Sequence, residues 1–146
     1  MLPPIEHPLI DAEVSVRPFE PADAEVLIAG RDAEFRRFLG EGSPDPRPAG
    51  CIRVFDSIVG WIDYDRDDRA WLADGEVNVG YTVFAPYRGH GYGGRALRLL
   101  REHLSSLEPP YVATLLIDPT NVASLALASR AGFNEVARVD RQVLMR

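Results

Sequence analysis

A cluster of glycines lies in the middle of the chain, in the segment Arg88-Gly89-His90-Gly91-Tyr92-Gly93-Gly94-Arg95. A strand-like run precedes it, and leucines at helical spacing follow it from Leu97 to Leu107. Glycine lets a ligand approach the backbone closely, and the first turn of a helix offers unpaired N–H groups and the positive end of the helix dipole. The segment therefore predicts a site for an anion such as a phosphate group.

Two well-known phosphate loops compete for this segment. A Walker A loop is excluded, because no Gly-Lys-Ser/Thr follows the glycines and the chain has no lysine. A dinucleotide fingerprint matches literally as Gly89-x-Gly91-x-x-Gly94, with Asp118 after the next strand as a candidate ribose ligand. That fingerprint follows its strand directly, whereas Ala85-Pro86-Tyr87 intervenes here. A dinucleotide-binding module therefore remains an alternative interpretation of this segment.

The elements around the glycines indicate one mixed α/β domain. Alternation and breakers predict seven strands, of which Val77–Val83 and the apolar run Tyr111–Ile117 flank the glycine-rich segment and its helix. Gly80 is a candidate β-bulge in the first of these two strands. About four helices are expected: two within Pro21–Leu39, one over Gly91–Leu107, and one over Val122–Ala131, for which Asn121 is a candidate N-cap and which Gly132 ends. We expect residues 1–13 to be a lead and residues 14–146 a single domain.

Composition narrows the class of protein. The 146 residues carry a net charge of −6, which makes nucleic acid an unlikely partner. Cys51 is the single cysteine, and the three histidines have no metal-ligand spacing, so we expect no disulfide and no metal site. The start of the chain lacks a signal-peptide pattern and no long apolar run occurs, so the sequence predicts a cytoplasmic protein without a membrane partner.

Two motifs together resemble the GNAT superfamily of acyl-CoA-dependent N-acyltransferases. Arg88-x-x-Gly91-x-Gly93 is similar to the Q/R-x-x-G-x-G/A motif of that family. The segment Asn121 to Phe133, Asn-x-x-Ser followed by Gly-Phe, is similar to its second motif, and one helix and one strand separate the two. The resemblance covers residues 14–146 and is closest to the branch that contains N-terminal acetyltransferases of ribosomal proteins.

The resemblance implies a fold, a co-substrate and the residues that bind it. The fold would be a GNAT-like mixed sheet, mostly antiparallel and splayed at the cofactor site, and the co-substrate would be acetyl-CoA. Backbone amides near Tyr81 and Thr82 would face the thioester oxygen. The residues that would contact the cofactor are Tyr81, Thr82, Val83, Arg88, Gly89, His90, Gly91, Tyr92, Gly93, Gly94, Arg95 and Asn121.

The sequence indicates the catalytic groups less clearly than it indicates the cofactor-binding residues. Glu76 is the expected general base for the acceptor ammonium, because it lies on the polar face of the strand that leads to the cofactor site. Many family members carry a tyrosine as general acid where this chain has Ala128. Ser124, one turn earlier, or a water molecule could protonate the departing thiolate instead. Phe35, Phe38, Trp61 and Trp71 are candidates for the acceptor side.

The function that the resemblance implies is transfer of an acetyl group from acetyl-CoA to a primary amine, by direct attack in a ternary complex. The acceptor would be a protein or peptide N-terminus or a small polycationic amine. Because position 128 lacks the tyrosine, a CoA-binding sensor domain without chemistry is the alternative.

Overall fold

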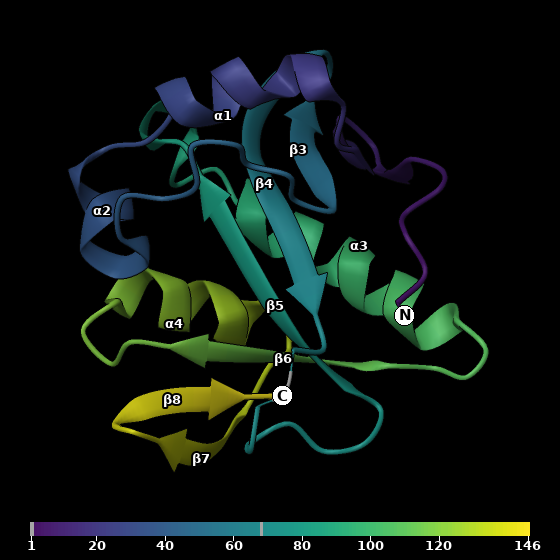
Figure 1. Cartoon of the computed structure of the whole chain (residues 1–146), viewed down its shortest axis with the longest axis vertical. Coiled ribbons are helices and arrows are strands. Elements are labelled where there is room, and N and C mark those ends of the chain that lie inside the picture. Colours follow the sequence, from purple (N-terminus) through teal and green to yellow (C-terminus); the bar gives the residue numbers. More distant parts are fainter. Residues whose placement is uncertain (1, 68) are drawn as a thin grey trace.

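The computed structural model describes residues 2–67 and 69–146, and within them the chain forms one sheet with helices on both faces (Figure 1). The strands are ordered β1-β2-β3-β4-β5-β6-β8-β7. Their bounds are β1 Leu9–Asp11, β2 Val14–Pro18, β3 Gly50–Val54, β4 Ser57–Asp65, β5 Glu76–Val83, β6 Val112–Ile117, β7 Glu135–Val139 and β8 Gln142–Met145. The α-helices are α1 Ala24–Ala29, α2 Ala33–Leu39, α3 Tyr92–Ser106 and α4 Val122–Arg130, and short 3-10 turns cover Pro21–Asp23 and Ala85–Tyr87.

The predicted fold class is confirmed. Neighbouring strands pair antiparallel except β5 and β6, which run parallel. The described residues contain eight strands rather than about seven, and the additional one is β1, which pairs with β2 inside the segment expected to be a lead. Ile5 of the same segment is buried in the core. The boundary at residue 13 stays a prediction.

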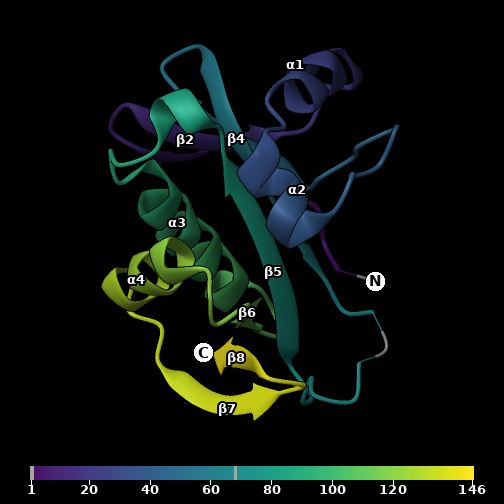
Figure 2. The same cartoon turned by 90° about the vertical axis from the view of Figure 1, so that its left-hand side faces the viewer.

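Helices α3 and α4 lie on one side of the central strands, and α1 and α2 lie on the other (Figure 2). The leucine stripe of α3 forms the centre of the main core, because Leu97, Leu100 and Leu104 are almost fully buried against the sheet. A smaller cluster of Leu27, Cys51 and Phe84 fills the opposite face. No helix in the described part of the chain is long and apolar enough to cross a membrane.

The sheet opens between β5 and β6. Their register pairs run from Glu76↔Val112 to Asn78↔Thr114, so β5 continues to Val83 without β6 beside it. The bulge predicted at Gly80 is wrong: the β4–β5 ladder passes through Asp63↔Gly80 without a shift in register. The splay comes instead from β6, which leaves β5 and pairs with β8 over Leu115–Ile117.

The topology also decides between the phosphate-binding alternatives. A dinucleotide fold needs a parallel, doubly wound sheet, and this sheet is mostly antiparallel. The interpretation of Gly89-x-Gly91-x-x-Gly94 as a dinucleotide fingerprint is therefore wrong. The predicted helix signals are confirmed: Gly91 precedes α3 with φ 80°, the side chain of Asn121 caps α4, and Gly132 follows α4 with φ 94°.

Candidate active site

A cavity of about 750 Å³ lies where β5 and β6 separate. Helix α2 borders it on one side of β5, and the first turn of α3 and most of α4 border it on the other. Its lining includes Glu34, Phe35, Phe38, Tyr81, Val83, Arg88, Gly91, Gly93, Gly94, Arg98, Asp118, Asn121, Ser124 and Arg130. The opening of the sheet therefore creates the cavity and joins its two ends.

The α3 end of the cavity is made of backbone. Gly91 takes a left-handed conformation with φ 80° and accepts the first helical hydrogen bond, from the N–H of Arg95 at 3.2 Å. The N–H groups of Tyr92, Gly93 and Gly94 belong to the first turn, where a helix offers no intrahelical acceptor. Together with the helix dipole, these groups can hold an anion.

Gly93 is required by packing as well. A Cβ atom at this position would lie 2.8 Å from Cδ1 of Leu127 on α4 and 3.1 Å from Cγ2 of Val83 on β5. The absence of a side chain lets the first turn of α3 approach both elements. The same glycine thus brings the anion-binding amides to the edge of β5.

The edge of β5 beyond Asn78 presents to the cavity backbone groups that no neighbouring strand pairs with. In an antiparallel ladder, the N–H and C=O groups of successive residues point alternately to opposite sides. Phe84 donates its N–H to the carbonyl of Val59, toward β4. The groups of Thr82 therefore face β4, and those of Tyr81 and Val83 face the cavity. The backbone amides of both Tyr81 and Thr82 are expected to face a thioester oxygen. The ladder directs the Tyr81 amide to the cavity, whereas the Thr82 amide points to β4.

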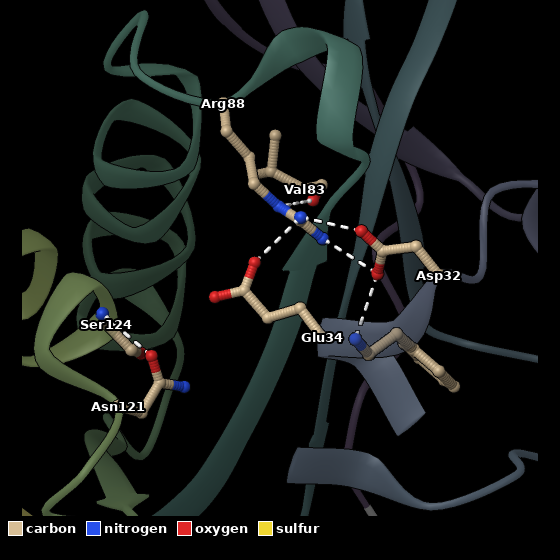
Figure 3. Close-up of polar contacts among 7 residues, drawn as sticks. Asp32, Glu34, Val83, Arg88, Asn121 and Ser124 are labelled. Carbon is tan, nitrogen blue, oxygen red and sulfur yellow. Dashed lines mark hydrogen bonds and ion pairs between the residues drawn. The ribbon is translucent and has the colours of Figure 1, made fainter. Parts of the chain in front are cut away.

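Arg88 joins this edge to helix α2 (Figure 3). Its Nε donates to the carbonyl of Val83 at 2.9 Å, and its Nη1 lies 2.7 Å from Oδ2 of Asp32 and 2.8 Å from Oε2 of Glu34. The bonds from Arg88, together with the N–H of Phe35, lower the pKa of Asp32 to about 2. One guanidinium therefore pairs with two carboxylates, of which Glu34 lines the cavity.

Two hydroxyl groups meet across the cavity from β5 to α4. The Tyr81 Oη and the Ser124 Oγ are 2.5 Å apart, and burial raises the pKa of Tyr81. Asn121 accepts the N–H of Ser124 at 3.2 Å, so its predicted role as the N-cap of α4 is confirmed (Figure 3). Ala128 is fully buried in the main core and is not a lining residue of the cavity.

The Acetyltransferase (GNAT) domain family model matches residues 13–134, most of the chain. The chain belongs to the GNAT acetyltransferase family. No curated protein sequence matches it significantly.

Solved structures show the same fold at low sequence identity. The aminoglycoside acetyltransferase AAC(6')-Ib in complex with paromomycin and acetyl-CoA superposes with a TM-score of 0.79 and 17% identity, over 91% of this chain and 92% of that chain. A ribosomal L7/L12 α-N-protein acetyltransferase in complex with coenzyme A superposes with a TM-score of 0.76 and 13% identity, over 94% of this chain and 95% of that chain. For the ribosomal-protein-S5-alanine acetyltransferase from Vibrio fischeri the TM-score is 0.75 and the identity 14%, over 94% of each chain.

Three of the side chains that the GNAT resemblance singled out lie away from the cavity. Glu76 is buried at the start of β5, where it forms an ion pair with Arg146 and accepts the N–H of Ala73 at 2.9 Å. His90 is exposed and stacks on Tyr92. Arg95 turns to the opposite side of α3 and binds the carboxylates of Asp11 and Glu13. The N–H of Arg95 also bonds within the helix, to the carbonyl of Gly91.

Other cavity residues of this GNAT domain were missed in the sequence. Arg98 and Arg130 line the α3–α4 end, where Nη2 of Arg98 donates to the carbonyl of Arg130 at 3.1 Å. On a helical wheel Arg98 lies outside the leucine stripe, so the sequence indicates only an exposed arginine at this position. Glu34 lines the α2 end beside Phe35 and Phe38, whereas Trp61 and Trp71 are not among the lining residues.

Proposed function

We propose that this protein transfers an acetyl group from acetyl-CoA to a primary amine, by direct attack in a ternary complex. The observation that carries the proposal is the continuity of the cavity, which runs from the first-turn amides of α3 along the edge of β5 that no strand covers to Glu34 on α2. The first-turn amides of α3 would hold an anionic pyrophosphate, and the Glu34 carboxylate would bind a cationic amine at the other end.

The cofactor half of the site has groups suited to the phosphates, the pantetheine arm and the thioester of acetyl-CoA. The amides of Tyr92, Gly93 and Gly94, with Arg98 and Arg130 nearby, would hold the phosphates. The backbone of Tyr81 and Val83 offers hydrogen bonds to the amide groups of the pantetheine arm. The Tyr81 N–H would stabilise the oxyanion that forms when the amine attacks the thioester carbon.

On the acceptor side, Glu34 would attract the ammonium group of the acceptor. Its side chain is 47% exposed, lines the cavity and shares Arg88 with Asp32. Glu76 was the expected base, yet Arg146 is its partner. A protein or peptide N-terminus is our first candidate acceptor and a small polycationic amine the second. Both kinds occur among the structural neighbours, as acetyltransferases of ribosomal proteins and of an aminoglycoside.

A thermal-shift titration with acetyl-CoA, CoA and NADH tests the cofactor half. A ligand at about 100 times its Kd stabilises the folded state by about 2.7 kcal/mol, which raises the Tm by several degrees. We expect a shift with both CoA species and none with NADH. No shift with either CoA species would contradict the proposal.

The acceptor is tested by acetyl transfer to a panel of peptides with free N-termini, polyamines and aminoglycosides. Product formation with one class identifies the acceptor. Because Glu76 is ion-paired outside the cavity and Ala128 is buried, a CoA-binding sensor domain is the second candidate. It predicts CoA binding without acetyl transfer to any member of the panel.

A further inference from the structure

Arg95 is a cation at an unfavourable place in a helix. It lies at the end of the first turn of α3, which its N–H closes by donating to the carbonyl of Gly91 at 3.2 Å. A positive side chain near the N-terminus opposes the helix dipole and lowers the stability of the helix. The arginine must therefore be explained by contacts outside α3.

The side chain of Arg95 binds the turn between β1 and β2. Its Nε lies 2.9 Å from Oδ2 of Asp11, and its Nη1 lies 2.7 Å from Oε1 of Glu13. Its Nη2 donates to the backbone carbonyl of Asp11 at 2.7 Å and to Oε2 of Glu13 at 3.3 Å. The bonds from Arg95 are the main reason why the pKa of Glu13 falls to about 2, so this carboxylate is ionised at neutral pH.

The β1–β2 turn is itself bonded to the rest of the sheet. Asp11 pairs with Val14 in the β1–β2 ladder. The carbonyl of Glu13 accepts the N–H of Phe55, from the turn between β3 and β4, at 2.8 Å. Ala12, between the two carboxylates, has a left-handed φ of 52°, which residues other than glycine adopt only where surrounding contacts hold them. Arg95 therefore ties the first turn of α3 to a fixed part of the sheet.

This tie supports the first turn of α3 from a second direction. Gly93 packs against α4 and β5 on the cavity side, whereas Arg95 reaches to the opposite side of the helix. The N–H groups that can hold an anion belong to the same turn. Hydrogen bonds weaken steeply with distance and angle, so small movements of this turn would weaken the binding of a ligand.

The charges of this cluster alone would disfavour a phosphate. Two carboxylates, Asp11 and Glu13, surround the single guanidinium of Arg95, so the cluster is negative. A negative charge behind the first turn repels an anion in front of it. None of the three side chains is a lining residue of the cavity. The cluster can therefore favour anion binding only through the position of the backbone.

Building on the function proposed above, we propose that Asp11, Glu13 and Arg95 are positioning residues of the cofactor site. Through Arg95, the two carboxylates hold the first turn of α3 in the geometry that binds the phosphates of CoA. In this role none of the three side chains contacts the cofactor. The segment expected to be a lead before the domain thus supplies part of the support for the cofactor site.

Glu13→Gln separates positioning from direct electrostatics by the sign of its effect. The variant keeps the shape of the side chain and removes its charge, which weakens the bonds to Arg95. CoA affinity would be measured by calorimetry for wild type, Glu13→Gln, Asp11→Asn, Arg95→Ala and the double variant Glu13→Gln/Arg95→Ala. Glu6→Gln is the matched control, because Glu6 is an exposed carboxylate of the same segment. Urea unfolding shows which variants are folded under the conditions of the binding experiment.

We expect Glu13→Gln and Arg95→Ala each to raise the CoA Kd by about three- to tenfold, as changes outside a site do when they are coupled to it. Asp11→Asn should raise it less, since the backbone carbonyl of Asp11 still accepts from Arg95. The double variant should bind no more weakly than the worse single variant, because both changes break the same contact. Glu6→Gln should leave the Kd within about twofold of wild type.

A Glu13→Gln variant that binds CoA as tightly as wild type, or more tightly, would overturn the inference, because only the loss of a repelling charge would then be felt. So would a double variant that regains wild-type affinity, since the two charges would then simply offset each other. Equal weakening by Glu6→Gln would show that the effect does not come from the contact with Arg95. If wild type does not bind CoA, the proposed function itself fails.

Discussion

At the α3 end of the cavity the lining combines backbone amides with the side chains of Arg98 and Arg130. At the α2 end it includes the side chains of Glu34 and Arg88, and Asp32 binds Arg88 from outside the lining. The α3 end depends on two glycines, Gly91 for its φ of 80° and Gly93 for close packing. The α2 end depends on the ion pairs of Arg88, which follows β5, with Asp32 and Glu34 at the start of α2.

Under the proposed function, this difference would separate the residues that bind acetyl-CoA from those that select the acceptor amine. Backbone amides remain in place when side chains change, so an end that relies on them is suited to an invariant ligand. Carboxylates on a short helix can be exchanged without rebuilding the fold, so an end built from them is suited to a variable partner. The four variants below test this division.

Gly93→Val should have the largest effect. The new side chain would overlap Leu127 and Val83, because even a Cβ atom lies 2.8 and 3.1 Å from them. Overpacking of this kind costs about 1–3 kcal/mol, and moving the first turn of α3 should weaken CoA binding by more than about tenfold. Urea unfolding and calorimetry with CoA measure the two effects.

Gly94→Ala is the control for Gly93→Val, since its Cβ atom would lie 4.0 Å from Leu127, an ordinary contact. It should leave stability unchanged or raise it by up to about 1 kcal/mol, because alanine favours the helix. Equal destabilisation by both variants would show that Gly93 has no special packing role.

Arg88→Ala should destabilise the protein by about 1.5–3 kcal/mol, the range for hydrogen bonds to charged groups. The change leaves Asp32 and Glu34 without their shared cation and removes the donor to the Val83 carbonyl. Urea unfolding measures the change. Arg47→Ala, in an exposed loop pair with Asp45, should change stability by less than about 0.5 kcal/mol. Matching losses in the two variants would contradict a structural role for Arg88.

Arg98→Ala should weaken CoA binding by about three- to tenfold at low salt, because it removes a cation near the phosphate-binding amides while leaving the core intact. The loss should shrink as salt is added. Calorimetry at two ionic strengths is the measurement. Arg138→Ala removes the same charge from β7, and an equal loss in that variant would point to net charge rather than to this site.

Asp32→Asn should have the smallest effect, since the Asp32 side chain is 31% exposed. Its pKa is about 2 in the folded protein and 3.8 ordinarily, so the ion pair with Arg88 stabilises the fold fully above about pH 4 and is lost as pH falls toward 2. The variant keeps a helix-capping side chain. Its Tm should lie below that of wild type at pH 7, and the two should converge between pH 4 and 2. A Tm difference that does not change with pH would contradict this account.

The parts of the site that could be predicted are those whose residues are close in sequence. The glycine turn, the leucine stripe of α3 and the Asn121 cap each depend on neighbours within about two helical turns. The fold class followed from the order of such elements together with the family resemblance. Local signals were thus sufficient for the backbone turn at the α3 end of the cavity, but they did not indicate Arg98 and Arg130 there.

The remaining parts join residues that no local pattern connects. Arg88 and Asp32 are 56 positions apart, and Tyr81 and Ser124 are 43 apart. Strand alternation gave the correct face for Glu76 but could not show that Arg146, at the other end of the chain, would be its partner. The bulge predicted at Gly80 is absent from the β4–β5 ladder, because glycine in a strand permits a bulge without requiring one.

The short parallel pairing of β5 with β6 also bears on how the molecule folds and opens. Three register pairs join these strands, and the chain between them runs through α3. Closing so long a loop for so few backbone bonds is entropically costly, so the seam should form late and open early. The unit of β6, α4, β7 and β8 should then exchange its amide hydrogens as a separate cooperative block. A ligand that contacts both sides of the seam would slow that exchange.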